Sequence, residues 1–396
     1  MISVDEAVAR ITAAFAPLEP ETVAIGDASG RVLAQDAIAR LSQPPFPVSS
    51  MDGYALRAVD AAEVGTGLNV IGSSPAGHPF QGTVGAGQAV RIFTGGVVPD
   101  GTDTIVIQED TSVSGSRVTL NIAASPGRHI RAAGLDFKAG EALAKSGHRL
   151  TARDLSLIAA GDIAEVSVRR RPRIAVAATG DELSLPGAPR KPGGIVASSG
   201  YALCAMIGRW GGEAIDLGIL PDTQEAVASI ADHAHRADLI VTLGGASVGE
   251  HDLVQKALGP RGFELDFWKI AMRPGKPLIF GRLGGTPLLG LPGNPVSTLV
   301  CAMLFLRPAI AAMLGAGDTV ETVAARLATD LKANDGRQDY IRARLVVRNG
   351  DRFVEPFGVQ DSSMLSSLAR ADALIVRPPH APAASAGTGV TIMLLD

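Results

Sequence analysis

The chain has 396 residues, a length that normally forms about two or three domains, and it contains 46 glycines and 25 prolines. With 46% hydrophobic and 19% charged residues and a positive mean hydropathy, it can bury a large core, which excludes a disordered low-complexity chain. A net charge of −4 excludes a protein that binds nucleic acid through bulk positive charge. Two cysteines are too few for a disulfide framework or a Cys-rich zinc site. The chain begins with no signal peptide, and its longest apolar run, residues 299–306, is too short to span a membrane, so we expect a cytoplasmic protein.

The first part of the chain combines a helix with β-rich sequence. Residues 3–15 predict a short amphipathic helix with acidic residues in its first turn. From residue 20 to 149, short apolar runs are separated every few residues by glycine or proline, which is typical of a β-rich domain. Thr151 and Asp154 form the pattern of a capping box, which predicts a helix over 151–161.

The middle of the chain has the pattern of an α/β domain. A basic run at 169–173 precedes it, which we interpret as an exposed domain junction rather than an anion site. Strands are expected at 173–178, 214–220, 238–243, 277–280 and 287–291, and helices at 198–210, 223–236, 253–258 and 295–314, the last broken near Pro308. This alternation indicates a parallel, doubly wound sheet. After Gly315, short strands at 322–329, 339–348, 352–356, 373–377 and 389–395 indicate a small β-barrel or sandwich.

Glycine-rich loops follow two strands of this sheet, at the edge where open α/β sheets bind ligands. Gly180 is followed by the adjacent carboxylates Asp181 and Glu182, which suit Mg²⁺ beside a phosphate; the alternative is an acidic helix N-cap. The second loop contains Gly244, Gly245, Ser247 and Gly249, whose backbone N–H groups could form an anion cradle. Asp252 follows this loop and could reach a metal or a hydroxyl; the alternative is an ordinary turn with Asp252 as the helix cap.

Two further loops carry cations and helix N-terminal groups. Arg273 and Lys276 lie in a loop stiffened by two prolines, which suits an oxyanion site, although an exposed turn is the alternative. Asn294 follows Pro292 and Gly293 and is expected to cap the helix that carries Ser297 in its first turn. This arrangement places N–H groups and a hydroxyl at a helix N-terminus, where anions bind.

Other candidate chemistry is weaker. The segments 49–55 and 93–99 pair polar residues with glycines and are read from spacing alone as tight turns. The seven histidines show no metal-ligand spacing, no Ser/His/Asp arrangement stands out, and Cys204 and Cys301 are expected to be inert core thiols. Covalent catalysis is therefore poorly supported.

The loops, in this order, resemble the molybdopterin molybdenumtransferase family, which comprises MoeA-type proteins and the E domain of gephyrin. The resemblance covers nearly the whole chain, and Met-Asp-Gly-Tyr-Ala and Leu-Pro-Gly-Asn-Pro-Val-Ser are specific together at this separation. The matching residues are 50–55, 94–95 with 98–99, 179–183, 244–249, 274–277, 291–297, Arg337, Arg342 and 362–366.

The resemblance implies an elongated homodimer and an enzyme of molybdenum cofactor biosynthesis. The expected fold class is α/β plus β-rich domains: a helical linker domain of residues 1–19 and 136–168, a β-rich domain of 20–135, a molybdopterin-binding α/β domain of 169–314 and a C-terminal β-barrel of 315–396. The family reaction consumes adenylylated molybdopterin and molybdate, uses Mg²⁺ and releases AMP. The molybdopterin adenylyltransferase is an expected partner; nucleic acid and membrane are not.

The resemblance also implies roles for individual residues. Asp52, Thr94, Glu182, Asp252 and Lys276 are the expected catalytic residues, with Glu182 and Asp252 at the metal and with Asp52 and Thr94 acting across the dimer. The expected anion-binding residues are Arg273, Lys276, Ser297, Arg342 and Ser363. The expected substrate-binding residues are Asp136, Gly180, Asp181, Gly244, Gly245, Ser247, Gly249, Pro292, Gly293 and Asn294.

The chain departs from the family pattern at several positions. Ala197 and Ser199 replace part of an Asp-Ser/Thr-Asn run, Leu135 interrupts a Gly-Glu-Asp stretch, and Arg273 stands where lysine is usual. These changes favour the alternative hypothesis of a diverged paralogue that binds molybdopterin as a scaffold with little or no turnover.

Overall fold

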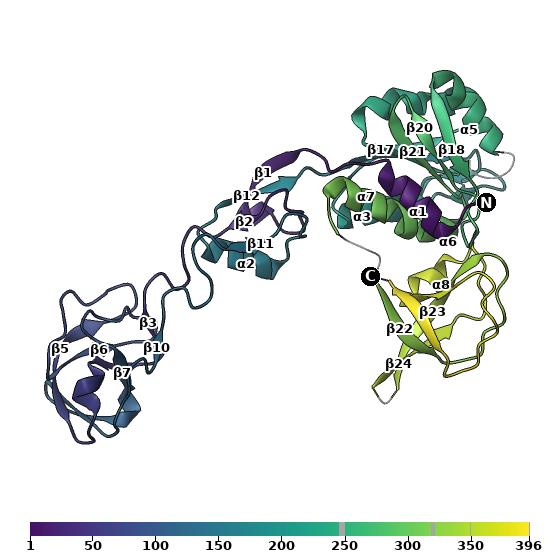
Figure 1. Ribbon diagram of the computed structural model, residues 1–396. Helices are drawn as coiled ribbons and strands as arrows, with labels where there is room; N and C mark the ends of the chain where they lie inside the picture. The colour runs from purple at the N-terminus through teal and green to yellow at the C-terminus, as the bar shows by residue number, and fades with distance from the viewer. Residues whose placement is uncertain (245–249, 318–320, 349, 396) are drawn as a thin grey trace.

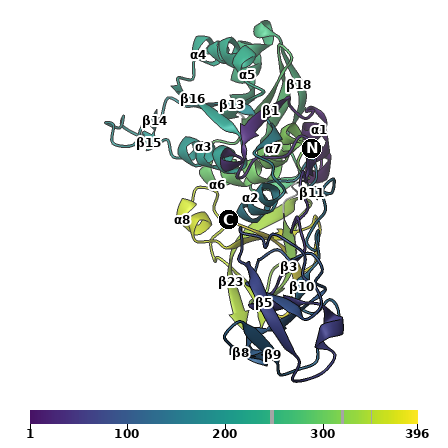
Figure 2. The same cartoon turned by 90° about the vertical axis from the view of Figure 1, so that its left-hand side faces the viewer.

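The computed structural model describes residues 1–244, 250–317, 321–348 and 350–395. The molecule is elongated: a β-rich distal lobe lies at one end, and a small middle lobe joins it to an α/β domain with a C-terminal barrel beside it (Figure 1). Figure 2, turned by 90°, shows the strands β14 and β15 projecting from the α/β domain.

The distal lobe is a six-stranded sheet of order β7-β4-β6-β5-β9-β8. Its strands are β4 (Gly53–Leu56), β5 (Gly67–Ser74), β6 (Gln88–Ile92), β7 (Thr104–Ile107), β8 (Thr111–Ser114) and β9 (Arg117–Leu120). Leu56, Val106 and Leu120 belong to its buried core. The prediction of a β-rich N-terminal region is confirmed.

The middle lobe is built from two separated segments of the chain. Strand β1 (Pro20–Ala24) pairs with β12 (Glu165–Arg169), and β2 (Ala37–Ile38) pairs with β11 (Ala142–Ala144). Helix α2 (Ala152–Ala160) packs against β11 and begins with the predicted capping box between Thr151 and Asp154. The segment 20–38 therefore packs with 142–169, which differs from the predicted division at residue 20. Strands β3 (Val48–Ser49) and β10 (Ile130–Arg131) pair with each other on the side toward the distal lobe (Figure 1).

The α/β domain is a six-stranded sheet of order β16-β13-β17-β21-β20-β18. Its strands are β13 (Arg173–Thr179), β16 (Glu213–Leu220), β17 (Leu239–Leu243), β18 (Phe263–Trp268), β20 (Ile279–Leu283) and β21 (Thr286–Leu291). The prediction of a parallel sheet is wrong for β20, which runs antiparallel to both of its neighbours, β21 and β18. Strand β18 was not predicted. Only a Gly284-Gly285 turn separates β20 from β21, whereas a parallel pair needs a long crossover.

Helices cover this sheet and extend its core. They are α3 (Ser199–Arg209), α4 (Gln224–Ala228) with the 3₁₀ segment η4 (Ser229–Arg236), α5 (Glu250–Leu258), α6 (Pro295–Cys301), the π-helical segment η6 (Ala302–Leu306) and α7 (Arg307–Leu314). The N-terminal helix α1 (Val4–Ala13) packs against α7 and buries Val4, Ala7 and Ile11 in the same core.

The long helix over Pro295–Leu314 continues through Pro308, so the predicted break is wrong. Proline removes a helical N–H and crowds the carbonyl four residues earlier, and the wider π-turn just before it absorbs both effects. The helix is long and apolar enough to cross a membrane, but 72% of its apolar window is buried inside the protein. Among the described residues it is the only such helix.

The C-terminal domain is a closed barrel rather than a sandwich. Its strands are β22 (Thr322–Leu327), β23 (Gln338–Arg348), β24 (Asp351–Pro356), β25 (Ala373–Arg377) and β26 (Gly389–Leu394), and the pairing of β23 with β25 closes it. Strand β19 (Met272–Arg273) of the preceding domain joins the edge of this sheet beside β23. The Arg273–Lys276 loop therefore lies where the two domains meet.

Thr242 in the centre of β17 carries a buried hydroxyl with no hydrogen-bond partner among the described residues. An unsatisfied buried hydroxyl costs about 1–3 kcal/mol, and valine has the same shape without it. We expect Thr242→Val to raise the free energy of unfolding by about 1 kcal/mol, measured by urea denaturation. The control Thr298→Val should lower it, because that hydroxyl donates to the Pro292 carbonyl at 2.6 Å. A loss of stability in Thr242→Val would contradict this prediction.

Candidate active site

Three of the predicted loops meet at one edge of the α/β sheet, because β13, β17 and β21 are neighbours whose carboxyl ends point the same way. The Gly244 N–H donates to the Leu291 carbonyl at 3.1 Å. Gly244 has φ +94°, and a Cβ there would lie 2.9 Å from the Thr179 carbonyl oxygen. A Cβ on Gly293 would lie 3.6 Å from the Gly244 Cα. The left-handed backbone and the close approach to Thr179 therefore require glycine at 244, and these contacts bring the loops at 180, 244 and 293 together.

The acidic loop after β13 carries two exposed carboxylates. Asp181 accepts the Asp222 N–H at 3.3 Å, and its carbonyl accepts the Lys191 ammonium at 3.1 Å. The Glu182 carboxylate folds back over Gly180, where a Cβ would lie 2.7 Å from its Oε2. No helix begins here, so the helix-cap alternative is wrong: β14 (Leu183–Ser184) follows and pairs with β15 (Ile195–Val196).

The glycine-rich loop after β17 is only partly described. Gly244 is placed as above, whereas Gly245, Ser247 and Gly249 lie outside the described residues. Asp252 belongs to α5, but its side chain is outside the described part of the structure. The anion cradle and the role of Asp252 remain predictions.

The two cations of the proline-stiffened loop have different environments. Arg273 donates from Nε to Asp339 Oδ1 at 2.6 Å and from Nη2 to Oδ2, and this carboxylate raises the pKa of the guanidinium. Lys276 is exposed, and its ammonium contacts no partner among the described residues. Gly275 between them lies against Cys301 of α6, since its carbonyl accepts the thiol at 3.8 Å. Lys276 is therefore the more available cation of the loop.

The N-terminus of α6 is where the C-terminal barrel docks. Asn294 is the N-cap, as predicted, although its side chain makes no cap hydrogen bond. Ser297 in the first turn is 5% exposed, and its hydroxyl has no partner among the described residues. The Val296 N–H donates to the carbonyl of Ser362, a residue of the barrel, at 3.1 Å.

The barrel contributes Arg342 and Ser363 beside this helix. Arg342 as a whole residue is 1% exposed, and its guanidinium donates from Nη1 to the Asp361 carbonyl at 2.7 Å. Ser363 donates its backbone N–H and its hydroxyl to the Asp361 carboxylate at 2.8 and 2.6 Å, which lowers the pKa of that carboxyl. Because Ser362 in the same turn contacts α6, these residues lie next to the α/β crevice. A cavity of about 640 Å³ opens beside them and is lined by Arg273, Arg342, Gln360 and Arg377, among others.

Asp52 and Thr94 form a pair in the distal lobe. The Thr94 N–H and hydroxyl donate to Asp52 Oδ1 at 2.8 and 2.9 Å, and these bonds, with the charge of Arg91, lower the pKa of Asp52. The Arg91 guanidinium stacks over the Tyr54 and Phe93 rings at about 5 Å. Side-chain hydrogen bonds and ring contacts therefore join the two segments to each other, whereas the spacing alone predicts two separate tight turns.

The fold does not bring this distal pair to the crevice of its own chain. Thr94 follows β6, which lies at the opposite end of the molecule from α6 (Figure 1). Asp136 is exposed on the segment between the middle and distal lobes, where its N–H donates to the Gln43 carbonyl at 2.9 Å.

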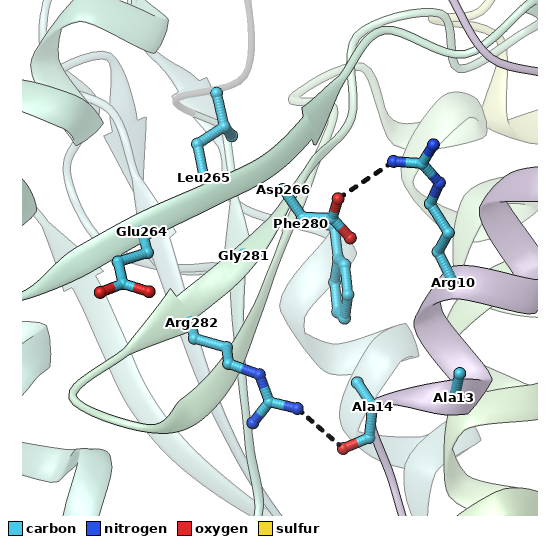
Figure 3. A pocket seen from close by; sticks show the side chains of 9 residues that line it. All are labelled: Arg10, Ala13, Ala14, Glu264, Leu265, Asp266, Phe280, Gly281 and Arg282. Atoms are coloured by element: carbon cyan, nitrogen blue, oxygen red, sulfur yellow. Dashed lines mark hydrogen bonds and ion pairs between the residues drawn. The ribbon is translucent and has the colours of Figure 1, made fainter.

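A second groove, of about 500 Å³, lies between α1 and the β18–β20 hairpin and contains none of the predicted site residues (Figure 3). Arg10 donates to Asp266 at 3.1 Å, and Arg282 donates to the Ala14 carbonyl at 3.2 Å, so these side chains fasten α1 to the sheet. Within the described residues, no three His, Cys, Asp or Glu side chains gather to form a metal site.

Sequence reasoning did not find two residues that shape the site, Asp339 and Gln360. Each acts on an arginine from a distant position in the chain, and no local pattern marks such a contact. Asp339 lies opposite Arg273 in adjacent strands. The sequence would indicate this contact only if the pairing of β19 with β23 were already known.

Comparisons with known proteins cover the whole chain. Residues 2–161 match the MoeA N-terminal region (domain I and II), 175–312 a probable molybdopterin binding domain, and 324–395 the MoeA C-terminal region (domain IV). The chain is 35% identical to a molybdopterin molybdenumtransferase from Haemophilus influenzae, over 99% of this chain and 98% of that protein. It is 36% identical to a protein of the same name from Nostoc sp., over 95% and 89%. The crystal structure of a molybdopterin biosynthesis MoeA protein from Pyrococcus horikoshii OT3 superimposes with a TM-score of 0.87 at 28% identity and full coverage of both chains.

Proposed function

Because this chain belongs to the MoeA-type molybdopterin molybdenumtransferase family, we propose that its crevice transfers molybdenum from molybdate to molybdopterin. The protein is a transferase of molybdenum cofactor biosynthesis. Three features around α6, from two domains, support this assignment. The loop that carries Lys276 contacts Cys301 at the end of the helix, Ser297 lies in its first turn, and the turn beside Arg342 contacts Val296. Their unpaired charges and hydroxyl suit a doubly charged tetrahedral oxyanion.

The proposed reaction breaks the phosphoanhydride of adenylylated molybdopterin. AMP leaves, and the oxygen that replaces the broken bond comes from water or molybdate. The two dithiolene sulfurs of the substrate form bonds to molybdenum, and one molybdate oxygen takes up two protons and leaves as water, with no change of oxidation state. The loops after β17 and β21 would border the substrate phosphates at the sheet edge, while Lys276 and Arg342 hold molybdate. The metal-binding sulfurs belong to the substrate, so the two cysteines of the chain have no part in the step.

Mg²⁺ fits the acidic side of this crevice. The exposed Glu182 carboxylate lies over Gly180, and Mg²⁺ commonly takes only one or two protein carboxylates because phosphates and water complete its shell. We assign Glu182 and Asp252 as its protein ligands. When bound, Mg²⁺ would offset the negative charge on the leaving AMP phosphate.

We further propose that the active enzyme is a homodimer in which the distal lobe of one subunit completes the crevice of the other. Asp52 is bonded to Thr94, which follows β6, and β6 lies at the opposite end of the molecule from α6 (Figure 1). Several apolar side chains are exposed along the segments that lead to the distal lobe, which favours a protein partner there. These are Ile38, Leu41, Phe46, Met51 and Leu135.

The proposed setting is the cytoplasm. Both Cys204 and Cys301 are free thiols, as is usual in a reducing compartment. The substrate is the product of an adenylylation, so the enzyme that supplies it is a molybdopterin adenylyltransferase, which we propose as a transient partner.

The function is tested by incubating the protein with adenylylated molybdopterin, molybdate and Mg²⁺ and measuring AMP. We expect molybdate-dependent AMP release, and we expect Lys276→Ala to slow it about 100-fold, because an anion-stabilising donor is lost. The control Lys145→Ala should keep the wild-type rate, since this lysine pairs with Asp36 in the middle lobe. Substrate that binds without molybdate-dependent AMP release would support the scaffold hypothesis instead.

A further inference from the structure

Arg342 is held in place by a single side chain, that of Gln360. The Gln360 Oε1 accepts two hydrogen bonds from Arg342, one from the backbone N–H at 3.0 Å and one from the side-chain Nε–H at 3.1 Å. The Gln360 Nε2 donates to the Arg342 carbonyl at 3.0 Å and to the Phe357 carbonyl at 2.8 Å. The Gln360 amide therefore holds both the backbone of β23 at Arg342 and the Arg342 guanidinium. Its bond to Phe357 also holds the loop after β24 beside them.

The contacts of the Arg342 guanidinium are all uncharged. Besides the Gln360 amide it meets the carbonyl of Asp361 at 2.7 Å, while the Asp361 carboxylate is engaged by Ser363. No carboxylate of the described residues forms an ion pair with Arg342, although its side chain is almost fully buried and burial lowers its pKa. Arginine stays protonated under such conditions, so the cavity keeps a positive charge with no carboxylate hydrogen-bonded to it; the Asp361 carboxylate acts on this charge only through space.

Arg273, which lines the same cavity, has the opposite environment. Its fork is bound by both oxygens of Asp339, and Asp335 lies 3.7 Å from its Nη1. A carboxylate paired in this way neutralises the guanidinium and takes up the donors that would bind an oxyanion. The two arginines differ in the group that orients each: a carboxylate for Arg273 and an amide for Arg342.

We propose that Gln360 is a positioning residue that orients Arg342 through an uncharged amide and so reserves its charge for the substrate oxyanion. This inference rests on the proposed function and extends it to a residue outside the predicted site. A carboxylate at this position would make the same hydrogen bonds to the guanidinium, but it would neutralise the cation and repel molybdate.

The test replaces Gln360 with glutamate, which keeps its size. We expect Gln360→Glu to raise the KM for molybdate at least tenfold, while kcat and the KM for adenylylated molybdopterin stay within twofold. Titration calorimetry with molybdate alone should show a matching loss of affinity. The melting temperature is compared with that of Gln360→Met, because both variants lose the hydrogen bonds that Nε2 donates to the Arg342 and Phe357 carbonyls. The uncharged variant Gln360→Met should raise the molybdate KM less, because it loosens Arg342 without neutralising it.

The control Gln35→Glu adds the same charge to the exposed surface of the middle lobe and should leave the molybdate KM unchanged. An unchanged molybdate KM and affinity in Gln360→Glu would overturn the proposal. A joint fall of kcat and melting temperature, equal in the Glu and Met variants, would also overturn it, because it would indicate a purely structural role. A wild-type protein without molybdate-dependent AMP release would overturn the proposed function, and the calorimetry would still decide the role of Gln360.

Discussion

Mixing the inactive variants Asp52→Asn and Lys276→Ala is expected to restore about a quarter of the wild-type rate of AMP release. Each variant alone should fall about 100-fold, because each removes a charged group from every site. In a mixed dimer whose sites are completed across the subunits, one site receives both defects and the other is intact. Random exchange makes about half of the dimers mixed, so about a quarter of all sites recover.

The geometry makes Asp52→Asn a clean variant for this experiment. An asparagine Oδ1 can still accept the N–H and hydroxyl of Thr94, which now donate to Asp52 at 2.8 and 2.9 Å, so the turn is preserved while the charge is lost. The Lys276 ammonium has no partner among the described residues, and the backbone bond from the Ile270 N–H to its carbonyl is kept in alanine, so the truncation should not disturb the fold.

The control for complementation pairs two defects on the same side of the site. Lys276 and Ser297 both belong to the crevice of one chain. In a mixed dimer of Lys276→Ala and Ser297→Ala, each crevice therefore still has one defect, and the mixture should stay inactive. Two differently tagged variants report subunit exchange independently. Exchange without recovery in the Asp52→Asn and Lys276→Ala mixture would contradict a site completed by the distal lobe of the partner.

Gly275→Ala is expected to destabilise the protein by about 3 kcal/mol or more and to lower the rate of AMP release. Gly275 has φ +106°, and a Cβ there would lie 2.4 Å from the Cys301 Sγ and 3.2 Å from the Met272 Cε. Cys301 is fully buried in α6 and cannot withdraw. The loop must shift to admit the methyl group, and it carries Lys276 with it.

The matched control for this prediction is Gly87→Ala. Gly87 also has a left-handed backbone, with φ +71°, but nothing lies within 4 Å of the added Cβ. Its cost should be about 1 kcal/mol, the price of the backbone conformation alone. The double variant Gly275→Ala/Cys301→Ala should cost less than the sum of its single variants, since it removes the clashing sulfur. Thermal and urea unfolding measure these differences, and equal losses in the two glycine variants would show that the contact with Cys301 does not matter.

Local sequence pattern was sufficient for much of this fold. The capping box at Thr151 and the strands of the C-terminal barrel depend on neighbours in the chain, and they lie where the pattern predicts them. The β20–β21 hairpin was predicted as separate parallel strands, because two short apolar runs look alike in either orientation. The continuity of the helix through Pro308 was missed because a π-turn has no clear signature in sequence.

By itself, the sequence determined which loops follow the strands of the α/β sheet, since glycines, prolines and charges at strand ends are a local signal. It placed Gly180, Gly244 and Gly293 at one sheet edge, and the structure brings them together there. Only the tertiary structure decided which charges are available: Arg273 is neutralised by Asp339, whereas Arg342 is held by the amide of Gln360 and keeps its charge. It also decided that β6, whose following residue Thr94 bonds Asp52, lies at the opposite end of the molecule from α6 (Figure 1). The physical reason is that a charge interacts with whatever side chain lies within a few ångströms of it, and packing between distant segments sets that neighbour.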